Sequence, residues 1–320
     1  MSDMTTDNLH SLGNEIREIE HRFKQEIEPF RSELWGYCYK LTRSPWDAED
    51  LVQDTLLKSL GMLAKMHQPV HTKAYIFRIA TNLWIDKKRR DRNQEQPLIE
   101  ELHHDNGTAF NFQLIDNLDY LIDHLTPVQY VTLILTEAFQ FKAKEAAGIM
   151  GTSENAIYAN LSRARAVLKK IGDIPASGEV RTADLSPDGP LAVLLEGFRS
   201  KDPECIASIL SKDVIVDITH AGVEMGLDET KKNSLKDWKQ IVDEQHEIVA
   251  EYRELWGLPV VAEFEKKADG KLYLSNIHYV EAYEDEITYW KFYCFSWDLM
   301  KLAADELGVG LNAAYFYHIY

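Results

Sequence analysis

The chain has 320 residues, a length that corresponds to about two domains. Hydrophobic residues make up 45% of it and charged residues 27%, an ordinary balance that excludes a mostly disordered or collagen-like chain. Its 35 Lys and Arg against 52 Asp and Glu give a net charge of −17. That total excludes a surface that is basic all over and, taken alone, argues against a nucleic-acid partner.

The cysteines and the chain start indicate a reducing compartment. Cys38, Cys205 and Cys294 lie far apart and form no CxxC pair, so we expect free thiols, with neither a disulfide framework nor a metal site. The first ten residues do not read as a signal peptide, and no apolar run approaches the roughly 18 residues that span a membrane. We therefore expect a cytoplasmic protein without a membrane segment.

The acidic charge is unevenly distributed along the chain. A linker rich in Pro, Gly and small residues is predicted over 172–190. Residues 1–171 hold 21 basic and 24 acidic residues, a net of −3, whereas the remainder holds 14 and 28, a net of −14. A weaker linker at 93–113 separates two helical modules. The predicted domains are therefore 12–92, 114–171 and a mixed module at 191–320.

The first helical module contains a helix that begins at Ser44. Ser44 is a suitable N-cap, and Pro45 suits the first turn. Acidic and amide side chains then gather on or beside one face: Asp47, Glu49, Asp50, Gln53 and Asp54. The helix dipole favours acids in the first turn, which leaves Asp54 unexplained. The alternative interpretation is an acidic docking surface for a basic partner.

The next helix, predicted over 72–90, ends in concentrated basic charge. Residues 87–92 carry five basic charges and one acidic charge. Cations suit a helix C-terminus, but this number exceeds what a cap needs, so we interpret the run as a phosphate-contacting patch. The polar residues of this patch and of the adjoining helix face are Arg78, Asn82, Lys87, Lys88, Arg89, Arg90 and Arg92. Trp84, close by, belongs either to the core or to a surface that stacks on an unpaired base.

Residues 125–170 contain the clearest pattern. Thr126 and Pro127 open a helix, a short helix follows over 142–150, and the turn 151–153 leads into a longer helix. This arrangement is typical of a helix-turn-helix, and the alternative is a helical hairpin used only for packing. The side chains expected to reach base edges and phosphates in a major groove are Ser153, Glu154, Asn155, Tyr158, Ser162, Arg163 and Arg165.

Three blocks in this order, 47–60, 74–90 and 125–168, resemble bacterial RNA polymerase sigma factors of the extracytoplasmic-function type. The resemblance implies that 12–92 is sigma domain 2 and that 114–171 is sigma domain 4. It also implies two partners, core RNA polymerase and promoter DNA.

The resemblance further implies a role for each block. The acidic block docks on the polymerase clamp helices, and the 74–90 block, Trp84 included, recognises and melts the −10 promoter element. The loop at 66–71 captures a flipped base, and the helix at 153–169 reads the −35 element. The chain departs from the family pattern at Tyr158 and Asn160, where basic residues are common, and at 136–148, TEAFQFKAKEAAG.

The last module reads as helices followed by strands, which predicts an α+β fold with a curved antiparallel sheet. Its order resembles the NTF2-like or SnoaL-like cone, a fold that encloses an apolar pocket. The predicted helices are 191–199, 203–210 and 231–244, and the predicted strands are 214–218, 248–255, 259–266, 272–280 and 286–295. Candidate pocket residues are Asp217, His220, Trp256, Tyr279, Trp290 and Tyr293. Alternatively, these aromatic residues form the core and Asp217 faces water.

Three functions follow from these patterns. The first is a sigma factor whose own C-terminal module contacts the sigma domains and modulates them. The second is a helix-turn-helix regulator that never touches polymerase, and the third is an NTF2-like ligand sensor or enzyme tethered to a DNA-binding region. Residues 1–171 contain no Gly-rich phosphate loop, metal-ligand spacing or nucleophile motif. We therefore favour the first function, with no catalytic residue, metal or cofactor, and leave a small-molecule ligand of the C-terminal module open.

Overall fold

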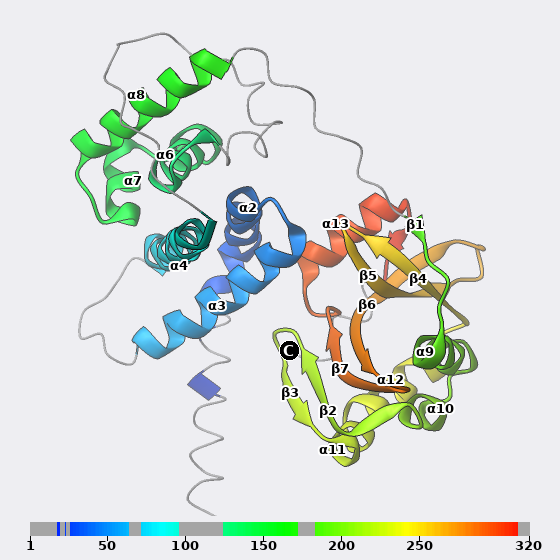
Figure 1. Cartoon of the computed structure of the whole chain (residues 1–320). Helices are drawn as coiled ribbons and strands as arrows, with labels where there is room; N and C mark the ends of the chain where they lie inside the picture. The colour runs from blue at the N-terminus through cyan, green and yellow to red at the C-terminus, as the bar shows by residue number, and fades with distance from the viewer. Residues whose placement is uncertain are drawn as a thin grey trace, which may run out of the picture. The chain divides into compact units, whose positions relative to one another are not determined.

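The computed structural model describes residues 18, 19, 23, 26–63, 72–95, 124–171 and 183–312. The chain divides into two compact units, Met1–Gly178 and Glu179–Tyr320 (Figure 1). The division falls within the linker predicted at 172–190.

The described part of the first unit is all-helical. Helices α2, α3 and α4 pack on one another, α7 packs on α4, and α6 packs on α8 (Figure 1). The elements are η1 (Glu28–Phe30), α2 (Arg31–Thr42), α3 (Pro45–Leu63), α4 (Thr72–Glu95), α6 (Pro127–Leu133), the π-helical turn η3 (Ile134–Ala138), α7 (Ala143–Met150) and α8 (Glu154–Ile171). The expected all-α character of both modules is confirmed.

Side-chain caps explain where these helices begin. The Ser44 hydroxyl accepts a hydrogen bond from the backbone N–H three residues later, at 3.2 Å, and the Ser153 hydroxyl does the same at the start of α8. Thr126 and Gln129 form a reciprocal capping box ahead of α6. All three starts lie where the sequence predicts them, because a cap depends on local residues alone.

Tyr37 lies at the centre of the first unit's core. Its ring stacks on that of Phe77, with centroids 4.9 Å apart, and its hydroxyl forms a 2.7 Å hydrogen bond with the hydroxyl of Thr81. Cys38 is fully buried beside it. Burial raises the pKa of both Tyr37 and Cys38, so both side chains are neutral and belong to the structural core.

The second unit is an eight-stranded sheet with helices. The strand order is β1-β4-β5-β6-β7-β2-β3, and β8 pairs with β6. The elements are β1 (Ala183–Asp184), α9 (Gly189–Ser200), α10 (Pro203–Ala207), β2 (Leu210–Ile218), β3 (Gly222–Met225), α11 (Leu227–Lys232), α12 (Ser234–Asp243), β4 (Glu247–Leu255), β5 (Leu258–Lys266), β6 (Leu272–Tyr283), β7 (Glu286–Phe292), α13 (Trp297–Leu307) and β8 (Gly310–Leu311). The α+β prediction is confirmed.

The structure corrects several details of this module. The sheet is mixed, because β2 pairs in parallel with β7 across a long connection. The predicted helix over 231–244 is two helices that meet at Asn233. Helix α13 was not predicted, and it buries Leu299, Met300 and Ala303. Strand β1 and the start of α9 lie inside the segment predicted to be a linker.

A buried polar network joins the helices of the second unit to its sheet. Glu263 on β5 accepts a hydrogen bond from Trp238 Nε1 at 3.0 Å and lies 3.1 Å from His278 Nε2. Trp290 Nε1 donates to His278 Nδ1 at 3.2 Å. Because Nδ1 accepts, a neutral His278 carries its proton on Nε2 and donates it to Glu263. Phe198 of α9 stacks on the His278 ring at 4.7 Å, so side chains from α9, α12 and three strands meet here.

We predict that Glu263→Ala destabilises the protein by about 3 kcal/mol, because it leaves the buried N–H groups of Trp238 and His278 without an acceptor. Urea denaturation followed by circular dichroism measures the loss. Glu247→Ala is the control, since Glu247 forms an exposed ion pair with Lys266 that contributes at most about 1 kcal/mol. An equal loss in both variants contradicts the account.

Candidate functional site

Helix α3 presents an acidic face, defined here as Asp47, Asp50 and Asp54. Asp50 and Asp54 are exposed one turn apart, and Asp47 is half-buried. Leu57, three residues after Asp54, lies on the same side of the helix and is 62% exposed. The sequence analysis missed Leu57, although its spacing from Asp50 and Asp54 could have revealed it. An exposed leucine beside fixed negative charge suits a protein partner with an apolar and basic surface.

Glu49 does not belong to the acidic face. Its side chain is 1% exposed and accepts a hydrogen bond from Trp35 Nε1 at 2.8 Å. The helix turns Glu49 toward the same side as Ala48 and Val52, which are buried. The expectation that Glu49 docks on a partner is therefore corrected: it joins α3 to α2. Gln53 is half-buried at the edge of the face.

Helix α4 carries the basic patch, defined here as Arg78, Lys88, Arg89 and Arg90. Arg78, Arg89 and Arg90 are exposed, as is the predicted neighbour Asn82, and Lys88 is half-buried. The side chain of Arg92 and the predicted base-capturing loop at 66–71 lie outside the described residues. The exposed guanidinium groups can bind phosphates without breaking contacts that hold the fold together.

Lys87 connects the two charged surfaces instead of belonging to the basic patch. Its Nζ lies 2.9 Å from Asp47 Oδ1. Partial burial lowers the pKa of Lys87, but the hydrogen bond to Asp47 and the charges of Asp47, Asp50 and Asp91 outweigh it, so the pKa is raised. Lys87 therefore stays charged, and its exposed ion pair with Asp47 links α4 to α3.

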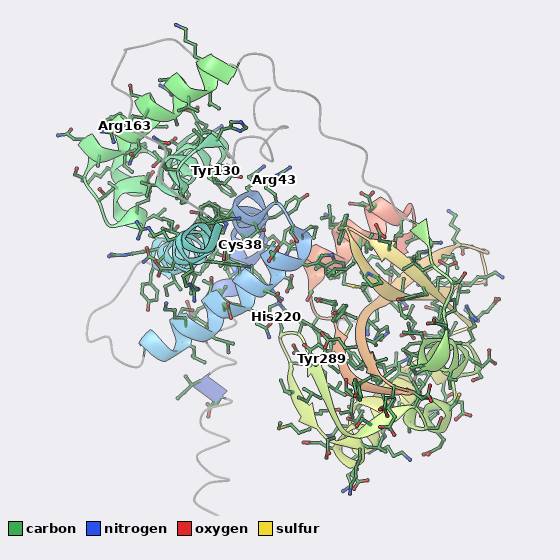
Figure 2. All side chains as sticks on the ribbon, in the orientation of Figure 1. Cys38, Arg43, Tyr130, Arg163, His220 and Tyr289 are labelled. Carbon is green, nitrogen blue, oxygen red and sulfur yellow. The ribbon has the colours of Figure 1, made fainter. Side chains whose placement is uncertain are left out.

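Trp84, predicted to contact unpaired promoter bases, is buried in this structure. It is 2% exposed, and its ring stacks on Tyr130 of α6 with centroids 5.5 Å apart. Figure 2 labels Tyr130, which lies near the end of α2 that carries Arg43. In this conformation the side chain of Trp84 is not available to DNA, because a neighbouring aromatic ring covers it.

The helix-turn-helix forms as expected from α7, a turn at Gly151 and α8. Gly151 ends α7 with φ of 65°, a left-handed conformation that favours glycine. The side chains predicted on the DNA-facing side of α8 that are exposed are those of Ser153, Glu154, Asn155, Tyr158 and Arg163. Arg163 is labelled in Figure 2, and Tyr158 is 60% exposed. These side chains form a reading face of the kind that enters a major groove.

Two residues predicted on this reading face are placed differently. Arg165 forms an ion pair with Glu137 of η3, with Nη2 and Oε1 2.6 Å apart. It therefore holds α8 to the preceding helical turn, which corrects its assignment to DNA. Ser162 is half-buried, because it lies beside the buried residue Leu161.

The six candidate pocket residues of the second unit do not form one site. Asp217 accepts a hydrogen bond from the Tyr289 hydroxyl at 3.0 Å, and its neighbour Val216 pairs with Trp290. Because successive strand residues face opposite sides, Asp217 and Trp290 lie on opposite faces of the sheet. Tyr279 pairs across the ladder with Lys291, on the same face as Asp217.

The other three candidates occupy different structural settings. His220 and Trp256 lie in turns and have φ values of 69° and 49°, whereas Tyr293 is buried after β7. The ionisable residues that do meet in the core, Glu263 and His278, were not singled out from the sequence. A glutamate inside the otherwise apolar run of β5 was the available signal.

Among the described residues, no group of three or more His, Cys, Asp and Glu side chains is arranged to hold a metal ion. No helix in that part of the chain is long and apolar enough to cross a membrane.

Comparison with known proteins identifies both helical modules. The model for Sigma-70 region 2 matches residues 27–94, and the model for Sigma-70 region 4 matches residues 115–168. The ECF RNA polymerase sigma factor SigG of Mycobacterium tuberculosis is 27% identical over 224 residues, which cover 60% of this chain and 60% of SigG. The chain carries both sigma-70 regions, in order, and is similar to extracytoplasmic-function sigma factors.

Two solved structures are also similar to the chain. The crystal structure of the M. tuberculosis sigma factor SigJ matches with 18% identity and a TM-score of 0.31, covering 84% of this chain and 95% of SigJ. A putative polyketide cyclase from Xanthomonas campestris matches with 14% identity and a TM-score of 0.23, covering 32% of this chain and 85% of the cyclase. This sigma factor spans about 60% of the length of its curated relative SigG.

We predict that Glu49→Ala lowers the stability of this sigma factor by about 1–3 kcal/mol, because it leaves the buried Trp35 N–H unpaired. Asp54→Ala, a change of similar size on the exposed side of the same helix, shifts it by about 0.5 kcal/mol or less. Chemical denaturation measures both. If Asp54→Ala costs as much as Glu49→Ala, the division of α3 into a structural side and a docking side is wrong.

Proposed function

We propose that this sigma factor binds core RNA polymerase and directs promoter recognition and melting for transcription initiation in the cytoplasm. The observation that carries the proposal is the match of two sigma regions, in order, to helical modules that expose an acidic face on α3 and a basic patch on α4. The proposed partners are core RNA polymerase and promoter DNA.

The acidic face is the proposed docking surface for polymerase. Asp47, Asp50 and Asp54 supply its charge, and Gln53 and Leu57 lie beside them. Exposed carboxylates steer association with a basic partner, whereas the apolar side chain of Leu57 gains affinity by leaving water. Both properties support a protein partner for α3 and leave DNA to α4 and α8.

The proposed −10 contacts are Asn82 and the basic patch, with Arg92 next along the helix. The reading face of α8 is the proposed −35 contact. There Asn155 offers an amide for a purine edge, and Tyr158 offers an apolar ring for a thymine methyl group. Arg163, further along the same helix, is placed for a phosphate.

We predict that the double variant Asp50→Lys/Asp54→Lys reduces affinity for core polymerase at least about a hundredfold, because two attractive charges become repulsive. Binding is measured with fluorescently labelled full-length protein. Asp285→Lys/Glu286→Lys, at the exposed hairpin between β6 and β7 of the second unit, makes the same change in net charge and serves as the control. Core binding that is unchanged in the first variant contradicts docking through the acidic face, whereas absence of core binding by the unmodified protein favours a helix-turn-helix regulator that never touches polymerase.

We also propose that the C-terminal module modulates promoter binding. Its residues hold most of the net charge of −17, and this negative potential competes with DNA phosphate for the basic patch. The scattered placement of Asp217, His220 and Trp290 supports a regulatory role over an enzymatic one. The alternative, a ligand-sensing or enzymatic NTF2-like domain, requires these or other residues to act on a small molecule.

We predict that removal of residues 179–320 raises promoter affinity and steepens its dependence on salt, because the DNA no longer has to displace an acidic competitor. A protease site placed after Gly178 allows the same preparation to be tested before and after cleavage. Binding to a promoter fragment is measured from low to high salt. If affinity and salt slope are both unchanged by cleavage, electrostatic modulation is wrong.

A further inference from the structure

The reading face of α8 carries an acidic side chain on a surface proposed to meet DNA. Glu154 is the first residue of the helix, directly after the Ser153 cap, and its side chain is exposed. Asn155 lies beside it, and Tyr158 follows one turn later on the same side of the helix. In a helix-turn-helix, the N-terminal residues of the second helix are those that contact base edges. Glu154 therefore lies where the DNA sequence is read.

The fold does not use the carboxylate of Glu154. The described residues of this module include two other acids, and each holds the structure together. Glu145 Oε2 accepts a hydrogen bond from the backbone N–H of Lys142 at 2.8 Å, and Glu137 forms the ion pair with Arg165. Within the described part of the chain, no hydrogen bond or ion pair occupies the Glu154 side chain. The helix dipole favours an acid in the first turn, but that effect does not depend on which DNA sequence is bound.

An ionised carboxylate only accepts hydrogen bonds, which limits what Glu154 can contact in DNA. Phosphates carry the same charge and repel it. In the major groove, guanine presents two acceptors, and thymine presents an acceptor and a methyl group, so neither base can pair with a carboxylate. Adenine presents its N6 donor beside the acceptor N7, whereas the N4 amino group of cytosine is a donor without a neighbouring acceptor on the same base. Cytosine is therefore the base that suits Glu154 best.

The charge of Glu154 also penalises the other bases. A carboxylate that enters the groove opposite a base without a donor loses water and gains no hydrogen bond in return, so the wrong sequence is actively rejected. Cations on the first helix of the helix-turn-helix compensate for the repulsion from the DNA backbone. Lys142 and Lys144, at the start of α7, are exposed, and the first helix of such a motif crosses the phosphate backbone. Helix α7 can thus hold the DNA while α8 brings Glu154 to the bases.

We propose that Glu154 is a specificity-determining residue, and that its carboxylate accepts a hydrogen bond from the N4 amino group of one cytosine in the −35 element. Asn155 and Tyr158 contact the neighbouring base pairs. The inference rests on the proposed sigma function and adds to it the identity of one base in the promoter.

Substitution of Glu154 should change the preferred base. Full-length protein and core polymerase are mixed with a pool of promoter duplexes whose upstream element is randomised, and the bound duplexes are recovered and sequenced. We expect the unchanged protein to select a C·G pair at one position. Glu154→Ala should lower this preference about tenfold at that position alone. Glu154→Gln should shift the preference toward adenine, because a glutamine amide pairs with N6 and N7 of adenine.

N4-methylcytosine tests the same contact from the side of the DNA. This base still pairs with guanine, but a methyl group replaces the amino hydrogen that faces the major groove. At the selected position it should weaken binding of the unchanged protein about tenfold and leave binding of Glu154→Ala unaffected. Glu306→Gln makes the same chemical change as Glu154→Gln on an exposed residue of α13, and as the control it should leave the preferred bases unchanged.

The outcomes separate this inference from the proposed function. No change in either Glu154 variant, an equal loss of preference at every position, or a loss at a position that is not a C·G pair overturns the inference. Glu154→Gln nearly keeps the size of the side chain, so its shift toward adenine is decisive even if Glu154→Ala disturbs the start of α8. A pool in which the unchanged protein selects no upstream element contradicts the proposed function instead.

Discussion

The packing of α4 is the interaction on which the functional surfaces of the first unit depend. One side of the helix buries Ile76, Phe77 and Ala80, and the other exposes the basic patch. The exposed Lys87–Asp47 ion pair links its outer side to α3. Since α7 packs against the same helix, the position of α4 determines which promoter-facing side chains are exposed and which are covered.

Charge in this protein is informative only when it is divided among surfaces. A net charge of −17 seems to exclude DNA, yet the first 171 residues are nearly neutral and segregate their charges onto α3 and α4. The ion pair between Asp47 and Lys87 forms the boundary between the acidic face and the basic patch. The proposed influence of the second unit's acidic charge acts at long range, so salt would screen it.

Local signals in the sequence predicted the helix starts, the helix-turn-helix and most strands, because caps, periodicity and turns depend on neighbouring residues. The burial of Glu49 and Trp84 depends instead on what packs against them, Trp35 in one case and Tyr130 in the other. The assignment of Arg165 to DNA failed for the same reason. Its ion-pair partner, Glu137, lies 28 positions away, so the pair could not be predicted from the sequence. Long-range contacts of this kind have no signature in one sequence.

The central claim is that this chain gives core polymerase a promoter specificity. In vitro transcription from a library of genomic fragments, with core polymerase of the source bacterium, tests it most directly. Full-length protein should produce transcripts with defined start sites, preceded by a common pair of upstream elements, that core polymerase alone does not make. A transcript pattern identical to that of core polymerase alone, for both the full chain and residues 1–178, would contradict the account.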